Sequence, residues 1–180
     1  ILTLSGYFPM HRTATFYLQL PLNLTYCNAS SAIHGFEMFQ RFIKFSSPNA
    51  LKVLDVSYCD VGSCNSTLLG LHVLETLDIS GNCHTINDIV LNNCSTLRHL
   101  RMSAMLVNPD FYRTRAWRLF QNLELLQTLD LSLNNLIHVD PHMLRAQRHL
   151  KELNLAGNRL QSLSVDLQPH PDLHLLDLSH

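Results

Sequence analysis

The sequence has almost no net charge and no long apolar run. Its 13 basic and 14 acidic residues leave a net charge of −1 over 180 residues. This balance gives no general attraction to nucleic acid or to an acidic membrane. No run of about 18 apolar residues occurs, so these residues contain no transmembrane helix, and no secretory signal is present.

Motifs for catalysis and metal binding are also missing. The sequence lacks C-x-x-C, H-E-x-x-H, G-x-S-x-G and any glycine-rich phosphate loop. His138 and His142 lie four residues apart, but Pro141 interrupts a helix through both. We therefore expect no enzyme activity, no cofactor and no metal. A role for the 11 histidines in tuning an interface in an acidic compartment stays open.

The chain does contain a repeat. Six segments begin with the pattern L-x-x-L followed, at the sixth position, by Leu, Val, Ile or Met, at intervals of 23, 23, 29, 24 and 23 residues. Positions are numbered from the first leucine of each unit. A period of this size with asparagine at position 9 is typical of leucine-rich repeats. The six units start at Leu51, Leu74, Leu97, Leu126, Leu150 and Leu173.

The spacing has a direct physical meaning. Side chains at positions 4 and 6 point the same way along a short strand, and stacked units bury them in a continuous apolar column. Position 9 is where the chain turns away, and a buried amide there can bond the free backbone groups. This position holds Asn82, Asn134, Asn158 and, in one unit, Cys59, whereas Met105 departs from the pattern. The predicted fold is α/β: a leucine-rich-repeat solenoid forming a curved horseshoe segment. Its concave face is a parallel β-sheet and its convex face is irregular or short-helical.

Residues 1–50 fit the repeat less well than residues 51–180. We interpret "LPLNLTYC" as a unit with Gln19 at position 1, Leu22 and Leu24 at positions 4 and 6, and Cys27 at position 9. Another strand is expected at Leu2 and Leu4, and a short convex helix over residues 36–45. Residues 1–180 would then form one partial array of about eight units. It would lack terminal caps, a transmembrane segment and a cytoplasmic domain, as expected of a piece of a longer array.

Four N-x-S/T sequons favour an extracellular location. Asn65 and Asn93 are predicted on the return side of their units, where a glycan has room. Asn28 is expected just after position 9, and Asn23 at position 5 on the concave face.

Five cysteines are an odd number. Cys27 and Cys59 are expected to be buried at position 9. A disulfide among Cys64, Cys83 and Cys94 is plausible in an oxidising compartment, but its pairing is not defined by the sequence.

Two regions are candidates for ligand contact. On the concave face, position 5 places Arg101 between Asp78 and Asp130, which fits either a structural charge ladder or a ligand site. The second region is the insertion "VNPDFYRTRAWRLFQNLELL", whose basic and aromatic residues could contact phosphates or stack on rings. Equally, Trp117, Leu119 and Phe120 could complete the core. The candidate contact residues are Arg98, Arg101, Phe111, Tyr112, Arg113, Arg115, Trp117 and Arg118.

The segment "LQTLDLSLNNLIHVDPHMLRAQRHLKELNLAGNRLQSL" resembles the extracellular repeats of Toll-like receptors. The resemblance implies the extracellular part of a single-pass receptor of innate immunity, at the cell surface or in endosomes. Such receptors bind a microbial or endogenous ligand, dimerise and signal through a cytoplasmic domain. The implied partners are a protein or microbial ligand and a second receptor, with nucleic acid as a further possibility for the basic insertion. Two alternatives stay open: a secreted or matrix adhesion protein, and a cytosolic inhibitor or sensor that glycans would exclude.

Overall fold

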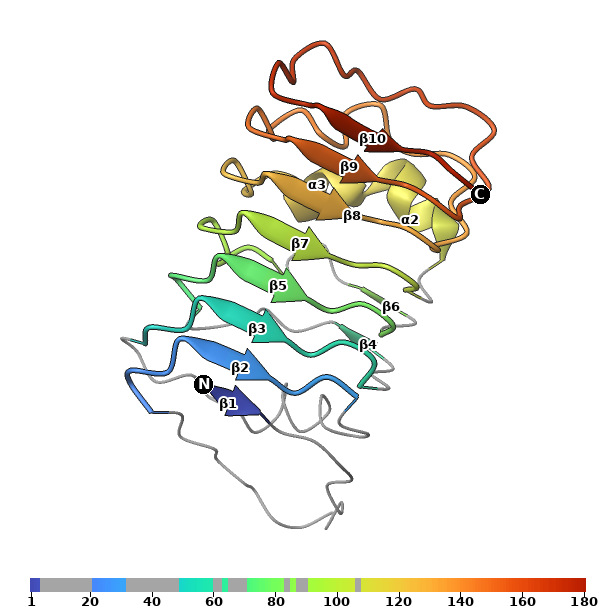
Figure 1. The fold of residues 1–180 in the computed structure, drawn as a ribbon. Coiled ribbons are helices and arrows are strands. Elements are labelled where there is room, and N and C mark those ends of the chain that lie inside the picture. The colour runs from blue at the N-terminus through green and yellow to red at the C-terminus, as the bar shows by residue number, and fades with distance from the viewer. Residues whose placement is uncertain are drawn as a thin grey trace.

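The computed structural model describes residues 1–3, 21–31, 49–59, 63–64, 71–82, 85–86, 91–105 and 108–180. These residues form a solenoid in which each unit adds one short strand to a single parallel sheet (Figure 1). The eight strands follow each other in the order of the units. They are β1 (Leu2–Thr3), β2 (Tyr26–Asn28), β3 (Val53–Asp55), β5 (Thr76–Asp78), β7 (His99–Arg101), β8 (Thr128–Asp130), β9 (Glu152–Asn154) and β10 (Leu175–Asp177).

The strands are in the predicted register from unit to unit. Leu54 pairs with Leu77, Leu77 with Leu100, and Leu100 with Leu129, so position 4 always faces position 4. All four side chains are buried, as are the leucines at position 1 of these units. Burying one leucine contributes roughly 1.5–3 kcal/mol. The stacked column is therefore the main source of stability, and the predicted solenoid architecture is confirmed.

The convex side carries short elements of two kinds. β4 (Ser63–Cys64) and β6 (Thr85–Ile86) form a small parallel ladder behind the main sheet. Two helices, α2 (Pro109–Thr114) and α3 (Ala116–Phe120), follow in the longest unit and lie behind β8 (Figure 1). In the described part of the chain, no helix has the length and apolar character needed to cross a bilayer. The expected helix over residues 36–45 lies outside the described residues.

Position 8 turns the chain away from the strand with a positive φ in each unit from Leu51 to Leu150. Its φ is +54° at Tyr58, +66° at Gly81, +58° at Leu133 and +65° at Gly157. This left-handed conformation suits glycine, and each glycine leaves room for the large side chain of the preceding unit. The Tyr58 ring covers Gly81, and the Leu133 side chain covers Gly157.

The register predicted for residues 19–27 is wrong by five residues. Cys27 pairs with Leu54 and is fully buried, so it occupies position 4 rather than position 9. Leu24 is then position 1, and Leu22 lies exposed in the turn before the strand. The expected strand at the start of the chain is present, and Leu2 pairs with Cys27.

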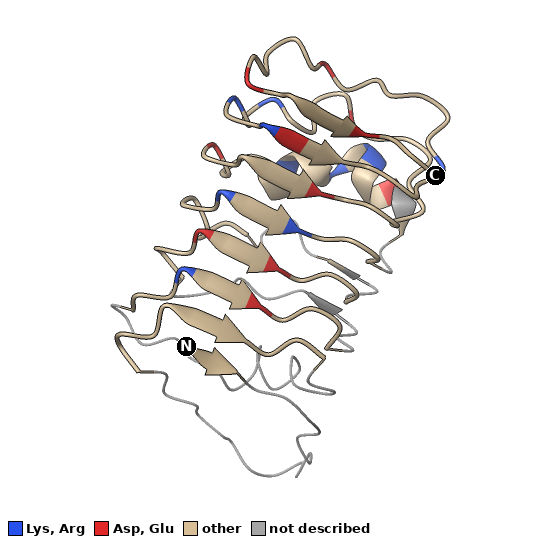
Figure 2. Cartoon of the chain, viewed as in Figure 1, with Lys and Arg blue, Asp and Glu red and all other residues tan. Residues whose placement is uncertain are grey.

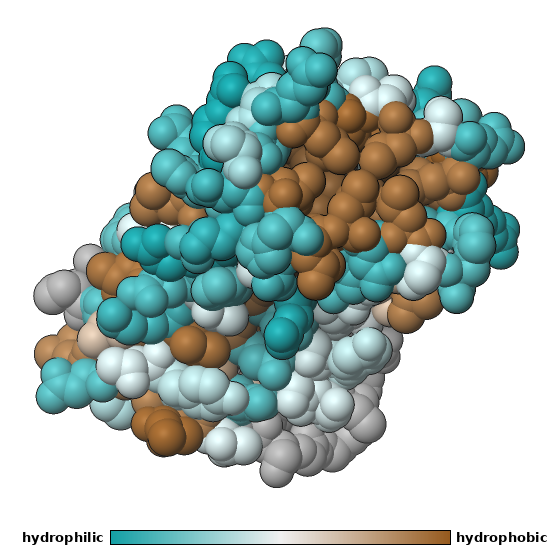
Figure 3. Space-filling model, turned by 45° about the horizontal axis from the view of Figure 1, so that its top comes forward, coloured by the Kyte–Doolittle hydropathy of each residue, from teal (hydrophilic) through white to brown (hydrophobic). Residues whose placement is uncertain are grey.

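The apolar column is exposed at the β10 end of the array. Figure 3 shows hydrophobic surface gathered there. Leu176 and Leu178 occupy positions 4 and 6, yet they are 39% and 44% exposed, whereas the equivalent Leu153 and Leu155 are buried. This face is a cross-section through the core.

Candidate functional site

Position 9 carries a ladder of buried asparagines that bonds each unit to the one before it. The Asn134 Nδ2 donates to the carbonyls of Met102 (2.7 Å) and Leu131 (2.9 Å), and its Oδ1 accepts from the Met105 N–H (2.8 Å). Asn158 repeats this geometry: its amide donates to Leu131 O (2.9 Å), and its Oδ1 accepts from the Asn134 N–H (2.9 Å). These asparagines are therefore structural.

The other position 9 residues behave differently from one another. Asn82 donates to the Val56 carbonyl (2.8 Å) and accepts from the Cys59 N–H (2.9 Å), which is the same pattern. Buried Cys59 donates its thiol to the Ala29 carbonyl (3.0 Å) of the preceding unit. Met105 is buried but has no side-chain amide, so the asparagine ladder is interrupted between the units of Leu74 and Leu97.

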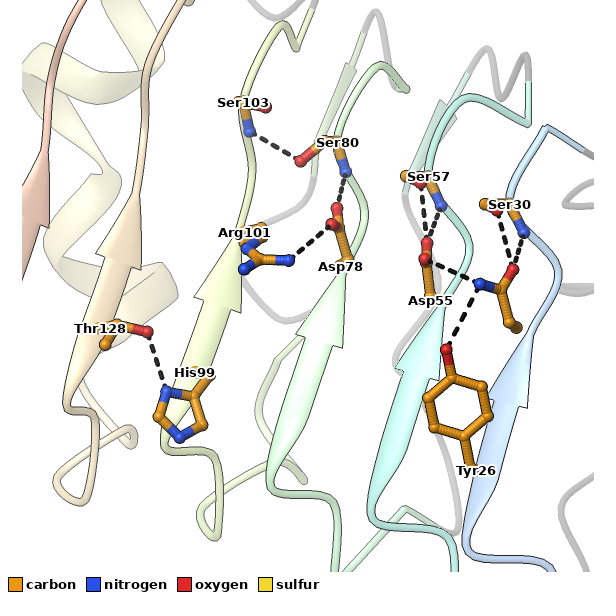
Figure 4. A network of polar contacts seen from close by, with 11 residues as sticks. Tyr26, Ser30, Asp55, Ser57, Asp78, Ser80, His99, Arg101, Ser103 and Thr128 are labelled. Carbon is orange, nitrogen blue, oxygen red and sulfur yellow. Dashed lines mark hydrogen bonds and ion pairs between the residues drawn. The ribbon is translucent and has the colours of Figure 1, made fainter. Parts of the chain in front are cut away.

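The concave position 5 residues serve the turn that follows each strand (Figure 4). Asp78 Oδ1 accepts the Ser80 N–H (2.9 Å), and Asp130 Oδ1 accepts the Ser132 N–H (2.9 Å). Asn154 does the same for the N–H of Ala156 (3.0 Å). This local side-chain-to-backbone bond is typical of Asp and Asn in turns. The carboxylates of this column therefore have a structural role, since each one stabilises the turn after its strand.

Arg101 is the exception in this column. Arginine has only donors, so it cannot accept the N–H of Ser103. The hydroxyl of Ser80 in the preceding unit takes that role instead (3.1 Å). The guanidinium of Arg101 lies 3.9 Å from Asp78 Oδ2, and its side chain is 67% exposed. Such an exposed pair contributes at most about 1 kcal/mol, which leaves the guanidinium able to contact a partner.

The insertion folds as two short helices that start with a defined cap. Asn108 Oδ1 accepts the Asp110 N–H (2.9 Å), and Pro109 occupies the first turn, where its missing N–H costs nothing. Tyr112, Leu119 and Phe120 are buried. The insertion therefore completes the convex side of the core, which is the second of the two interpretations given for it in the sequence analysis.

The aromatic candidates of the insertion are only partly available to a ligand. Tyr112 is fully buried, and burial raises the pKa of its hydroxyl well above 10.0. Phe111 stands edge-on to it at 5.5 Å between ring centroids. Trp117 is half-buried, and the guanidinium groups of Arg118 and Arg145 lie 5.3 and 5.6 Å from its ring centroid. Tyr112 is therefore not a contact residue.

The basic candidates do not form one site. Arg98 precedes β7 and Arg101 ends it, both on the sheet. Arg113 in α2, Arg118 in α3 and Arg115 between these helices lie on the opposite side (Figure 2). Arg113 also pairs with Asp110 at 3.2 Å. A single ligand cannot contact both groups without wrapping around the unit.

A second polar ladder, which the sequence analysis missed, lies three residues before position 1. Leu71, Cys94 and Leu123 are buried there, and so are Gln147 and His170. The Gln147 Nε2 donates to the Phe120 carbonyl (2.7 Å), and His170 Nε2 is 2.9 Å from the equivalent carbonyl of Leu144. The detectable signal was the constant offset of these residues from each first leucine.

Cys94 is not a disulfide candidate. It is fully buried as a free thiol, and burial raises the pKa of that thiol to about 12. It occupies the same core position as Leu71 and Leu123. Cys83 and the side chain of Cys64 lie outside the described residues, so a disulfide between them stays a prediction.

The corrected register changes the positions of two sequons. Asn28 lies at position 5 on the concave face, where its Oδ1 accepts the Ser30 N–H (2.9 Å) and its Nδ2 donates to Asp55 Oδ2 (3.3 Å). A glycan on that nitrogen would break the second bond. Asn23 lies instead in an exposed turn before the strand. Asn93 is partly exposed in a turn, and Asn65 lies outside the described residues.

Comparison with known proteins agrees with this architecture. A family model described as "Leucine rich repeat" matches residues 116–160. A solved chain titled "Structure of the Toll - Spatzle complex, a molecular hub in Drosophila development and innate immunity" is similar in fold, with a TM-score of 0.61 and 21% identity. The similarity covers 87% of this chain and 21% of that one, so this chain spans about a fifth of its length. The comparison with curated proteins gives no match.

These findings define the class of fold: the chain is a leucine-rich-repeat solenoid, and the family model matches part of the array. Such solenoids present an extended concave surface that is used for binding. Among the described residues, no three His, Cys, Asp or Glu side chains gather closely enough to hold a metal ion.

Proposed function

We propose that this chain is a ligand-binding segment of the extracellular part of a Toll-like receptor. The receptor would bind a protein or microbial ligand on the solenoid, dimerise and transmit the signal through a cytoplasmic domain. The observation that supports this proposal best is the uninterrupted eight-stranded parallel sheet, which carries charged residues on or beside its strands from β3 to β10 (Figure 2). A protein partner for that face is suggested by the similar chain, which was solved as the Toll–Spatzle complex.

An extracellular location is supported by two sequons. Asn23 and Asn93 lie in turns where the side chain reaches solvent, as N-linked glycosylation requires. Expression in cultured eukaryotic cells should give a protein whose mass falls after treatment with an endoglycosidase. Replacing Asn23 and Asn93 by Gln should remove part of that difference. A protein that carries no glycan would contradict the extracellular assignment.

Signalling is tested with the complete coding sequence. The transcript that encodes this chain should also encode a membrane span and a cytoplasmic Toll-type signalling domain. In a reporter cell line, a bivalent antibody against residues 51–180 should activate the reporter, whereas its monovalent fragment should not. A transcript that encodes a cap and then stops would instead indicate a secreted or matrix protein, the alternative function.

A further inference from the structure

A pocket of about 290 Å³ lies at the edge of the sheet where the strands begin. It is lined by Arg98, Leu125, Gln127, His149, Lys151 and Asp172. These residues come from four successive units, at position 2 and at the position just before position 1. The candidate site described above used only Arg98 from this group.

The cationic groups of the pocket come from alternate strands. Arg98, Gln127 and Lys151 precede β7, β8 and β9 in register, because His99 pairs with Thr128 and Thr128 with Glu152. Neighbouring strands are about 4.8 Å apart, so the backbones of Arg98 and Lys151 are separated by about 10 Å. Two long side chains at this distance can both reach one oxyanion placed over Gln127, whose amide offers a further donor.

The two cations have no ion-pair partner in the described part of the chain. The salt bridges of that part are Lys52–Glu75, Arg101–Asp78 and Arg113–Asp110. Glu75 is the acid nearest to Arg98 along this row, but Lys52 holds it at 2.8 Å. The Lys52 hydrogen bond, followed by the charges of Lys52, Arg98 and His99, lowers the pKa of Glu75. Arg98 and Lys151 therefore keep donors to offer to an outside group.

The charge of the pocket limits its occupant. Arg98 and Lys151 supply two positive charges and Asp172 one negative charge, so the net charge is +1 with His149 neutral. A single carboxylate matches this value. A nucleic-acid backbone or a sulfated glycan carries several adjacent anions, and Asp172 would repel them. Leu125, 39% exposed, adds an apolar wall for the methylene groups of an acidic side chain.

We propose that this pocket binds one acidic side chain of a polypeptide partner. Arg98 and Lys151 hold the carboxylate, Gln127 donates a hydrogen bond, and Asp172 excludes more highly charged groups. The inference rests on the proposed function only in taking the ligand to be a polypeptide. It adds a specific anchor point beside the concave face.

The experiment measures direct binding of the secreted protein to an immobilised peptide that carries a single glutamate among glycine and serine residues and has a blocked C-terminus, at physiological ionic strength. Arg98→Glu and Lys151→Glu should each weaken binding roughly five- to tenfold. Arg159→Glu makes the same charge change at an exposed arginine outside the pocket and should leave binding within about twofold. Asp172→Asn should tighten binding by about two- to fivefold, while Asp166→Asn, an exposed control outside the pocket, should not.

Three outcomes would overturn the proposal. One is equal loss of binding in Arg98→Glu and Arg159→Glu. Another is no gain in Asp172→Asn. The third is binding of heparin or oligothymidylate that depends on the pocket while the single-glutamate peptide does not bind. Because Asp172→Asn is a gain of binding, loss of folding cannot imitate it. The antibody reporter assay does not depend on this pocket, so either result can fail alone.

Discussion

Removing one asparagine from the position 9 ladder should destabilise the protein strongly. In Asn134→Leu, the Met102 carbonyl and the Met105 N–H lose their only hydrogen-bond partner among the described residues. The carbonyl of Leu131 is less affected, because the amide of Asn158 also bonds it at 2.9 Å. Each buried backbone group that is left unpaired costs about 1–3 kcal/mol, so the free energy of unfolding should fall by about 2–6 kcal/mol.

Equilibrium unfolding in guanidinium chloride, followed by circular dichroism, measures this change. Asn122→Leu is the matched control, because Asn122 is exposed and its amide contacts only the side chain of Asn92, at 3.4 Å. The control should change the free energy of unfolding by less than about 0.5 kcal/mol. If Asn134→Leu cost no more than this control, the ladder would not be a source of stability and the reasoning would be refuted.

Three further predictions follow from the turns and the buried thiol. Burial raises the pKa of Cys94 from 9.0 to about 12. The thiol therefore ionises at lower pH in the unfolded chain than in the folded one, and the free energy of unfolding should fall above pH 9. Rapid alkylation of Cys94 in the native protein near that pH would contradict its burial. Gly157→Ala should lower the free energy of unfolding by about 1–2 kcal/mol, because φ at this position is +65° and the new methyl group meets the Leu133 side chain. An unchanged free energy of unfolding would contradict this. Arg101→Asn restores a side-chain acceptor for the Ser103 N–H, so the free energy of unfolding should stay equal or rise by up to about 1 kcal/mol. A clearly lower melting temperature of the variant would contradict this.

The regular part of the fold could be predicted because its pattern repeats without ambiguity. From Leu51 onward each first leucine is followed by apolar residues at positions 4 and 6, and this fixed the strands and the buried column. Around Cys27 the same template fitted two registers. A cysteine is acceptable at position 4 as a small apolar residue and at position 9 as a turn residue. Only the pairing of Cys27 with Leu54 decides between them.

The candidate site was predicted less well than the fold. Arg101 was correctly placed between Asp78 and Asp130, because the register of the strands is fixed by the repeat. The neighbouring pocket was not predicted, since Arg98 and Asp172 are far apart in sequence and meet only through the stacking of four units. In the insertion, composition alone could not show which side chains of the two helices face the core, so Tyr112 was wrongly included among the contact residues.

The interruption of the ladder at Met105 has a consequence for orientation. A perfect repeat looks the same after a shift of one unit. A partner that bound to its surface could therefore bind in several equivalent positions along the array. The unit of Leu97 breaks this translational symmetry twice, since Met105 replaces the asparagine of position 9 and Arg101 replaces the acid of position 5. Between Asn28 and Asp177 the described residues of this column are otherwise acids and amides, so Arg101 makes one position on the surface different from the rest.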